Sequence, residues 1–455
     1  MRLDCFTAYD IRGRLGQTLD AGIAFRIGRG FARALAAKSM VIGRDCRASS
    51  QALAEAVVAA LLAEGVAVLD LGLAGTEEMY HATTQFAADG GITITASHNP
   101  IDYNGMKLVR AGAAPLDAGV LAEVRRLAEA DDFGAGRLGG SCQNISVAAR
   151  RGYVDTVLSF VDCAGLQPLV VLVNAGNGAA GPTFDAIAEG LAARGAALRF
   201  VRMHHTPDGR FPHGIPNPLL PENRPVTAAA VVASGADFGV AWDGDFDRCF
   251  LFDAAGTFVD GEYIVGLLAE AFLAREPGAR IVHDPRVIWN TQDVVAAAGG
   301  VAVQARTGHA FVKQAMRDQG AVYGGEMSAH HYFRDFTWCD SGMIPWLMIA
   351  ELVSRKGLAL ADLVAGRRAA FPSSGEVNFT LADPAAAVAR VRRQFEPLAV
   401  SVDAMDGLSL AFADWRFNLR QSNTEPVVRL NVESRGQGDL LADRVAAVKL
   451  ALLGA

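Results

Sequence analysis

Ser97 is the first side chain in the sequence that can do chemistry, and it lies in the run GGITITASHNPIDYNGMK. The alternating apolar residues before it predict a strand, and Ser97, His98, Asn99 and Pro100 predict a polar turn directly after that strand. A nucleophilic hydroxyl is well displayed at such a position, although the same four residues also suit an ordinary turn. The G-x-S-x-G sequence of acyl-transfer hydrolases does not surround Ser97, so the segment does not predict that class of enzyme.

Three aspartates in the run DGDFDR, Asp243, Asp245 and Asp247, are spaced at every second residue. In extended backbone this spacing points all three carboxylates to one side, and such oxygen ligands suit Mg²⁺. The loop is not an EF-hand, because Arg248 and Ala254 stand where that motif needs a glycine and a closing glutamate. A solvated turn is the alternative, but three neighbouring carboxylates repel one another unless a cation lies between them.

Two further polar loops suit the parts of a sugar phosphate. In GGEMSAHHYF, Glu326 and Ser328 follow a predicted strand, and a carboxylate beside a hydroxyl can hold two sugar hydroxyls. The turn RQSNTEP lies between two predicted strands, and its guanidinium, hydroxyl and amide groups suit a phosphate, with a simple hydrogen-bonded β-turn as the alternative. The side chains of this second group are Arg420, Ser422, Asn423, Thr424 and, on the following strand, Arg429.

The run GNGAAG at 176–181 fits the G-x-G-x-x-G pattern of dinucleotide-binding proteins and lies between a predicted strand and a predicted helix. The acidic residue that would bind the ribose is missing, because the next predicted strand ends in Arg202 and Met203. We therefore interpret the run as a tight turn between strand and helix.

The composition excludes several classes of protein. With 455 residues, of which 51% are hydrophobic and 20% charged, the chain is expected to form several globular domains. The net charge of -7 gives no general basic surface, so no nucleic acid partner is expected. No apolar run is long enough to span a bilayer, and the start MRLDCFTAYDIRG is too charged for a signal peptide, which predicts a cytoplasmic protein without a membrane partner. The six cysteines are scattered without a C-x-x-C pair, which indicates reduced packing residues.

Alternating helices and strands are expected to hold the polar loops. Ile23, Ile27 and Phe31 are spaced every four residues, which predicts a helix, and SMVIGRD then predicts a strand. The alternation continues along the chain, apart from a Gly-rich stretch at 134–144 that we interpret as a linker. After Ser374 the pattern changes to a strand, a helix, several close strands and a last helix, which predicts a separate α+β domain.

Segments along nearly the whole chain resemble, in order, the α-D-phosphohexomutase family and in particular its bacterial phosphomannomutase members. They are AYDIRG, GRD, TASHNP, DYNGMK, DGDFDR, TGHAFVK, GEMSAHHYF and RQSNTEPVVRL. The resemblance implies an α/β fold: three related α/β domains with mixed sheets and a smaller C-terminal α+β domain, around a central cleft. The implied domains are 1–143 with the phosphoserine loop, 144–256 with the metal-binding loop, 257–370 with the sugar-binding loop and 371–455 with the phosphate-binding loop.

The resemblance also implies roles for the candidate residues. Ser97 would carry the phosphoryl group, and it would bind Mg²⁺ together with Asp243, Asp245 and Asp247. Sugar hydroxyls would be held by Glu326 and Ser328, and the phosphate that does not react by Arg420, Ser422, Asn423 and Thr424. Residues matching positions that line the cleft are Tyr9, Arg12, Lys107, Arg248, Arg286, His309 and His330, with His309 or His330 as the base.

Two departures from the common family pattern concern the polar loops. Phe246 replaces a frequent glycine in the metal loop, and AHHY, beginning at Ala329, replaces a frequent GHVF in the sugar loop. Neither change removes a predicted ligand. The second is expected to bear on which sugar is preferred.

The activity implied is the reversible interconversion of mannose 6-phosphate and mannose 1-phosphate through phosphorylated Ser97 and a hexose 1,6-bisphosphate, which also serves as activator. The partner would be a small-molecule sugar phosphate. The alternatives are a dual-specificity phosphomannomutase/phosphoglucomutase, a metal-dependent phosphatase, or a sugar-phosphate-binding protein without turnover.

Overall fold

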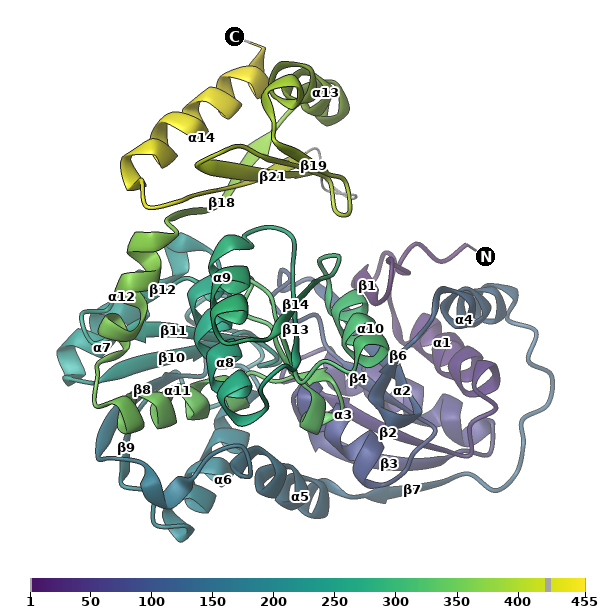
Figure 1. Ribbon diagram of the computed structural model, residues 1–455. Helices are drawn as coiled ribbons and strands as arrows, with labels where there is room; N and C mark the ends of the chain where they lie inside the picture. Colours follow the sequence, from purple (N-terminus) through teal and green to yellow (C-terminus); the bar gives the residue numbers. More distant parts are fainter. Residues whose placement is uncertain (1, 422–426, 455) are drawn as a thin grey trace. The chain divides into compact units, whose positions relative to one another are not determined.

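The structure is a computed structural model that describes residues 2–421 and 427–454. The chain forms two compact units, each built from two segments. The first unit comprises Met1–Phe258 and His330–Gly357, and the second comprises Val259–Ala329 and Leu358–Ala455. Figure 1 follows the chain through these segments by colour. Among the described residues, no helix is both long and apolar enough to cross a membrane.

The first unit begins with a mixed sheet in the order β1-β5-β4-β2-β3-β7. Strands β4, β2, β3 and β7 are parallel, whereas β1 and β5 run antiparallel to their neighbours. Its strands are β1 (Ile11–Arg14), β2 (Ser39–Arg44), β3 (Ala67–Leu73), β4 (Gly90–Ile94), β5 (Tyr103–Arg110) and β7 (Ser141–Asn144). Helices α1 (Ala21–Ala34), α2 (Ser50–Ala63), α3 (Thr76–Gln85) and α4 (Ala118–Ala130) accompany this sheet.

The helix predicted from Ile23, Ile27 and Phe31 is α1, and these three residues are buried in the core beside the sheet. Asp20 begins the helix, because its carboxylate accepts a hydrogen bond from the Ile23 backbone N–H at 2.8 Å. The four-residue spacing thus buries one face of the helix, as the sequence predicts.

The second sheet of the first unit contains β11, β10, β8 and β9 in that order. Strands β10, β8 and β9 are parallel, and β11 returns antiparallel to β10. The elements are β8 (Leu169–Asn174), α6 (Ala180–Ala193), β9 (Leu198–Met203), α7 (Pro225–Ser234), β10 (Phe238–Trp242) and β11 (Cys249–Asp253). The hairpin of β16 (His331–Phe333) and β17 (Cys339–Asp340) and the buried helix α11 (Met343–Lys356) also belong to this unit.

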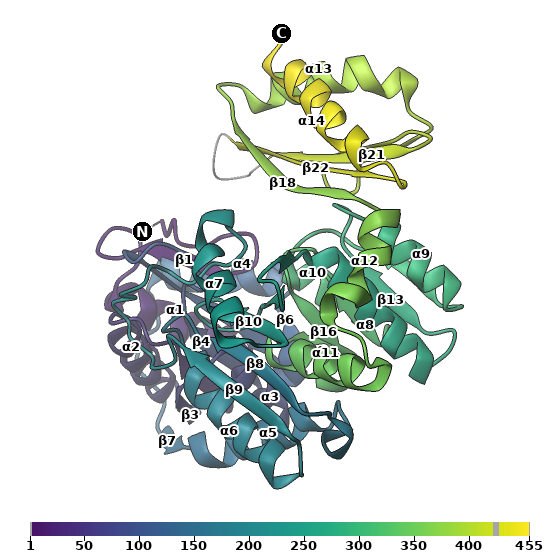
Figure 2. The same cartoon turned by 90° about the vertical axis from the view of Figure 1, so that its left-hand side faces the viewer.

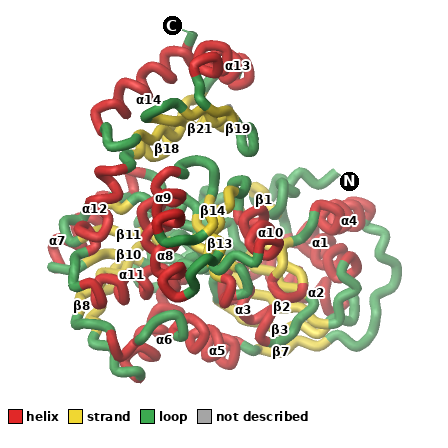
Figure 3. Tube along the Cα trace, viewed as in Figure 1, coloured by secondary structure: helices red, strands yellow, loops and turns green. Residues whose placement is uncertain are grey.

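The second unit begins with parallel strands in the order β14-β13-β15. Its elements are α8 (Gly261–Arg275), β13 (Arg280–His283), α9 (Trp289–Ala297), β14 (Val301–Gln304), α10 (His309–Gln319), β15 (Tyr323–Gly325) and α12 (Leu360–Ala370). Figure 3 shows the same alternation of helix and strand by colour. The loops after β13 and β15 therefore lie side by side at one edge of these strands.

The second unit ends in an antiparallel sheet in the order β18-β22-β21-β20-β19. Helices α13 and α14 cover one face of this sheet, as Figures 1 and 2 both show. Apolar residues of the strands and helices form the core between them, including Phe417, Leu430 and Val448. The elements are β18 (Ser373–Thr380), α13 (Pro384–Phe395), β19 (Ser401–Asp403), β20 (Leu408–Ala411), β21 (Trp415–Gln421), β22 (Val427–Ser434) and α14 (Gly438–Leu453).

The observed elements confirm the predicted fold class of α/β segments with mixed sheets followed by a smaller α+β segment. The interpretation of 134–144 as a linker is wrong for its last four residues. They form β7, which pairs in parallel with β3. Every residue of β7 is exposed, so this edge strand carries no apolar alternation that could have revealed it.

Candidate active site

Ser97 lies in the loop after β4, and its φ of 49° falls in the left-handed region that residues with a side chain rarely adopt. Its Oγ donates to Asp243 Oδ2 at 2.6 Å and lies 3.0 Å from His98 Nδ1. The Ser97 backbone N–H donates to the Thr95 hydroxyl at 2.9 Å. Strained backbone of this kind persists only where its surroundings hold it, and it is concentrated at functional sites.

Arg47 holds the Ser97 loop in shape, although the sequence analysis did not single it out. Its buried guanidinium donates to four carbonyl oxygens at 2.6 to 3.1 Å. The planar fork of an arginine suits several acceptors at once. The acceptors belong to Ser97, Asn99, Pro100 and Tyr103.

The three predicted metal ligands, Asp243, Asp245 and Asp247, lie in the loop between β10 and β11 and are at most 1% exposed. One carboxylate oxygen from each lies within 4.8 Å of the others. The Oδ1 atom of each is buried and has no hydrogen-bond partner. Buried carboxylate oxygens without partners are costly, and oxygens gathered in this way fit Mg²⁺.

Lys107, on β5, is the positive charge beside these aspartates. Its Nζ donates to Asp245 Oδ2 at 2.8 Å and also contacts Asp247 Oδ2. Although burial lowers the pKa of Lys107, the two carboxylates raise it above its ordinary value overall. Burial raises the pKa of both carboxyls, but Lys107 holds the pKa of Asp245 below its ordinary value. The pKa of Asp247 stays raised, because the charge of Asp245 adds to the effect of burial.

Thr76 also binds the metal loop and was missed by the sequence analysis. Its hydroxyl donates to Asp245 Oδ2 at 2.6 Å, from the first turn of α3. The backbone N–H of Thr76 donates to the Asp245 carbonyl oxygen at 3.3 Å. Thr76 therefore fixes both the backbone and the side chain of Asp245.

Both departures from the family pattern lie at positions with positive φ. Phe246 has φ of 48° and Ala329 has φ of 68°, a conformation that costs a side chain about 1–2 kcal/mol relative to glycine. The Phe246 ring is fully buried and packs against Gly75, where a Cβ would lie 2.2 Å from the ring. The glycine therefore makes room for the ring.

Three other predicted residues, Arg12, Arg248 and Tyr9, lie in the first unit. Arg12 Nη1 donates to the Thr95 carbonyl oxygen at 2.6 Å. It reaches that oxygen past Gly105, where a Cβ would lie 2.6 Å from the guanidinium. Arg248 Nε lies 3.8 Å from Asp243 Oδ2. Tyr9 is half-buried in the segment before β1.

His330 also lies beside the metal loop. Its Nδ1 lies 3.1 Å from Asp340 Oδ2 and 4.0 Å from Asp247 Oδ1. Asp340 is fully buried on the two-residue strand β17. It was not predicted, because a single aspartate there forms no recognisable sequence pattern. His330 is thus placed next to the phosphoserine and metal loops, within the first unit.

Arg286 contacts both residues of the predicted sugar-binding loop in the second unit. Its Nη2 lies 2.5 Å from Asp284 Oδ2, 3.0 Å from Ser328 Oγ and 3.6 Å from Glu326 Oε1. Asp284 was missed by the sequence analysis. Despite burial, Arg286 holds the pKa of Asp284 below its ordinary value. Asp284 and Arg286 follow β13, and Glu326 and Ser328 follow β15, so adjacent strands bring the two loops together.

His309 begins helix α10 in the same unit. The preceding Gly308 has φ of 122°, and its backbone N–H donates to Glu326 Oε1 at 3.0 Å. The structure therefore connects the loop of His309 to the loop of Glu326.

Arg420 and Arg429 lie directly opposite each other on β21 and β22. The predicted Ser422, Asn423 and Thr424 follow β21 in the sequence and lie outside the described residues. Arg420 lies on β21, one residue before its end, and its role in holding a phosphate stays a prediction.

The structure thus gathers the predicted residues into two groups, one in each unit. The first unit holds Tyr9, Arg12, Ser97, Lys107, Asp243, Asp245, Asp247, Arg248 and His330. The second unit holds Arg286, His309, Glu326, Ser328, Arg420 and Arg429.

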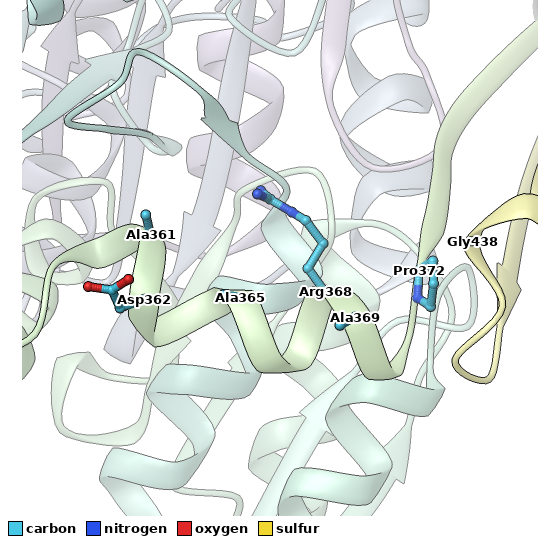
Figure 4. A pocket seen from close by; sticks show the side chains of 7 residues that line it. All are labelled: Ala361, Asp362, Ala365, Arg368, Ala369, Pro372 and Gly438. Atoms are coloured by element: carbon cyan, nitrogen blue, oxygen red, sulfur yellow. The ribbon is translucent and has the colours of Figure 1, made fainter.

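A surface hollow along α12 contains none of these residues. It is lined by three alanines, a proline and a glycine, with one aspartate and one arginine, as Figure 4 shows. Its lining residues are Ala361, Asp362, Ala365, Arg368, Ala369, Pro372 and Gly438. We assign no part of the candidate site to this hollow.

The chain was then compared with known proteins. It matches the phosphoglucomutase/phosphomannomutase family in all four of that family's segments: α/β/α domain I at 4–135, domain II at 151–256, domain III at 260–371 and the C-terminal domain at 376–451. It is 59% identical over 452 residues to a phosphomannomutase of Salmonella montevideo, covering 98% of both chains.

Two further relatives match over nearly their full length. The chain is 53% identical over 456 residues to a Xanthomonas campestris protein described as phosphohexose mutases, covering 100% of both chains. A crystal structure of a phosphoglucomutase/phosphomannomutase family protein from Burkholderia thailandensis has a TM-score of 0.85 and 31% identity, covering 98% of this chain and 97% of that one. The chain therefore belongs to the phosphoglucomutase/phosphomannomutase family.

Proposed function

We propose that the chain is an intramolecular phosphotransferase that interconverts mannose 6-phosphate and mannose 1-phosphate through phosphorylated Ser97. The observation that carries the proposal is the position of Ser97 Oγ, 2.6 Å from Asp243 in a loop of three buried aspartates. Phosphomannomutases related over almost the full length support mannose as the sugar.

Hydrogen bonds to its backbone position the loop that would carry the phosphoryl group. Four come from Arg47, and one runs from Ser97 N–H to the Thr95 hydroxyl. Phosphoryl transfer depends mainly on such placement and on neutralising the phosphoryl oxygens. Lys107, Arg12 and Arg248 supply positive charge for that purpose.

The residues proposed to hold Mg²⁺ are Asp243, Asp245 and Asp247, together with the phosphorylated Ser97. When bound, the metal neutralises charge on the phosphoryl oxygens and makes the serine oxygen a better leaving group. The unpartnered Oδ1 atoms of the three aspartates support this assignment. Lys107 contacts the other oxygens of Asp245 and Asp247, so its positive charge lies beside the proposed metal ligands.

The second unit supplies the proposed groups for recognition. Glu326 and Ser328 hold sugar hydroxyls, and Arg286 orients both through its contacts with them. Arg420, Arg429 and the predicted Ser422, Asn423 and Thr424 hold the phosphate that does not react. Under this proposal the chain has the four functional domains 1–143, 144–256, 257–370 and 371–455, each of which provides one loop.

The reaction requires a base for the sugar hydroxyl that receives the phosphoryl group. His330 is the candidate in the first unit, 3.1 Å from Asp340, and His309 is the candidate in the second. The hexose 1,6-bisphosphate formed then turns around, so that its other phosphate faces the dephosphorylated Ser97. Added hexose 1,6-bisphosphate acts as an activator because it restores phosphorylated enzyme.

A coupled assay tests the proposal. Purified protein with Mg²⁺ and catalytic hexose 1,6-bisphosphate is expected to convert mannose 1-phosphate to mannose 6-phosphate without releasing inorganic phosphate. Release of phosphate without isomerisation would instead indicate a metal-dependent phosphatase.

A dual-specificity phosphomannomutase/phosphoglucomutase is the second candidate, supported by the phosphohexose mutase of Xanthomonas campestris. Similar kcat/KM values with mannose and glucose phosphates would favour it.

A further inference from the structure

The C-terminal sheet has one polar face that carries the arginines of the proposed phosphate site. Alternate residues of its strands point to opposite faces, and the apolar set packs on α13 and α14. The polar set forms cross-strand pairs in a row between β21 and β22. The pairs are Arg416 with Glu433, Asn418 with Asn431, and Arg420 with Arg429.

Only the last of these pairs places two like charges directly opposite each other. Arg416 Nη1 contacts Glu433 Oε1 at 2.6 Å, so the first pair is neutral. Like charges that face each other across strands destabilise a sheet unless a counter-charge lies nearby. Arg420 and Arg429 therefore require an anion on this face of the sheet.

In the second unit, Glu376 of β18 provides that counter-charge. Its carboxylate lies 3.3 Å from Arg420 Nη2, 4.0 Å from Arg429 Nε and 3.9 Å from Arg286 Nη1. The strand register shifts between Ser373 and Glu376, a β-bulge that redirects side chains. Glu376 pairs with Asn431, so it lies on the same polar face as the two arginines.

The contacts of Glu376 are longer than the two tight ion pairs nearby, Arg286 with Asp284 and Arg416 with Glu433. Arg286 is already engaged by Asp284 Oδ2 at 2.5 Å and 3.0 Å, compared with 3.9 Å to Glu376. Arg420 has a second acidic neighbour, Asp406, at 3.5 Å. Glu376 is thus shared among three arginines without a tight bidentate pair to any of them, which is the arrangement expected of a carboxylate that can be displaced.

We propose that Glu376 is an internal counter-anion that occupies the arginine cluster of Arg286, Arg420 and Arg429 until the phosphate of the substrate displaces it. This inference rests on the proposed function, because it takes Arg420 and Arg429 as the phosphate site and adds Arg286 to it. The carboxylate neutralises the cluster in the free protein and competes with an arriving anion. A phosphate dianion with several acceptor oxygens outcompetes it, whereas a monovalent anion gains less from the same exchange.

Calorimetric titration of inorganic phosphate and of mannose 1-phosphate into the full-length protein tests the inference without relying on turnover. Removing the competing charge with Glu376→Gln is expected to tighten the binding of both ligands about fivefold. Glu376→Asp keeps the charge on a shorter side chain, so it should tighten binding less than Glu376→Gln. The matched control is Glu396→Gln, which removes the same charge from the ion pair of η5 (Glu396–Leu398) with Arg392 and should change neither affinity.

Weaker binding by Glu376→Gln would overturn the inference, because it would mean that the carboxylate holds the arginines in place for the phosphate. Unchanged binding would also overturn it, since the charge would then not compete. Thermal unfolding of each variant identifies any loss of fold. If the wild-type protein lacks mutase turnover, the proposed function fails, whereas the effect of Glu376 on phosphate binding is read separately from the titration.

Discussion

The two groups of candidate residues differ in the charge of their central side chains and in how those side chains are paired. In the first unit, three buried aspartates lie together, two of them in contact with Lys107, and their Oδ1 atoms are left without hydrogen bonds. In the second unit, Arg286, Arg420 and Arg429 share Glu376 as an acidic neighbour. Carboxylates that each keep one oxygen without a hydrogen bond suit a cation, whereas arginines that share one carboxylate suit an anion that arrives and leaves. Changes in the first group should therefore lower kcat, and changes in the second should raise KM.

Ser97→Ala gives the largest expected effect. Without the hydroxyl that carries the phosphoryl group, kcat should fall at least about a thousandfold. The fold should be kept, because Arg47 binds the backbone of this loop rather than the hydroxyl. A steady-state assay checks the change, with Ser141→Ala on the exposed strand β7 as control. Near-normal turnover of Ser97→Ala would remove the first group from the mechanism.

Asp245→Asn should weaken Mg²⁺ binding and reduce kcat, because one of three carboxylates facing the metal loses its charge. Lys107 and Thr76 would keep the side chain in place, so the effect should be on the metal rather than on the fold. Activity measured against Mg²⁺ concentration checks the shift, with Asp362→Asn on the exposed face of α12 as control. An unchanged Mg²⁺ dependence would show that the loop does not bind the metal.

Arg420→Ala tests the second group, the arginines of the proposed phosphate site. Since the phosphate it holds is bound similarly in ground and transition states, KM for mannose 1-phosphate should rise about tenfold to a hundredfold with kcat little changed. Arg393→Ala, at an exposed position on α13, is the control. A fall in kcat alone would mean that Arg420 acts at the transferring phosphoryl group, and the contrast between the two groups would be lost.

The preference for mannose over glucose is the smallest effect that we expect. Glu326 and Ser328 are proposed to hold the 3- and 4-hydroxyls, which mannose and glucose share, so the 2-hydroxyl that distinguishes them is not read by this pair. Mannose 1-phosphate should be preferred, with measurable turnover of glucose 1-phosphate. Comparing kcat/KM for both sugars under one Mg²⁺ and activator condition checks this. A ratio above about 10⁴ would require a dedicated contact to the 2-hydroxyl, and a preference for glucose would contradict the proposed substrate.

The sequence predicted the residues that form local patterns and missed those that act across the chain. The alternating aspartates of DGDFDR and the turn after the strand at Ser97 were recognisable because a few neighbouring residues carry the signal. Arg47 was missed because it follows an ordinary strand, and its acceptors lie about fifty residues later. Thr76, Asp340 and Glu376 were missed for the same reason, since their partners come from other elements of the fold.

The positive φ values of Ser97, Phe246 and Ala329 also lay beyond the reach of sequence reasoning. A left-handed conformation is normally inferred from glycine, and these three residues have side chains. The sequence revealed only that Phe246 and Ala329 depart from the family pattern. The structure explains both as residues placed where glycine would cost less.

Peptide mapping by mass spectrometry after incubation with hexose 1,6-bisphosphate tests the central claim, that Ser97 relays the phosphoryl group, most directly. The account predicts one added phosphoryl group on the peptide that contains Ser97. When that group carries an isotopic label, the label should move to the sugar phosphate after mannose 1-phosphate is supplied. Ser97→Ala should acquire none. Full mutase turnover by protein that carries the phosphoryl group elsewhere, or never carries one, would contradict the account.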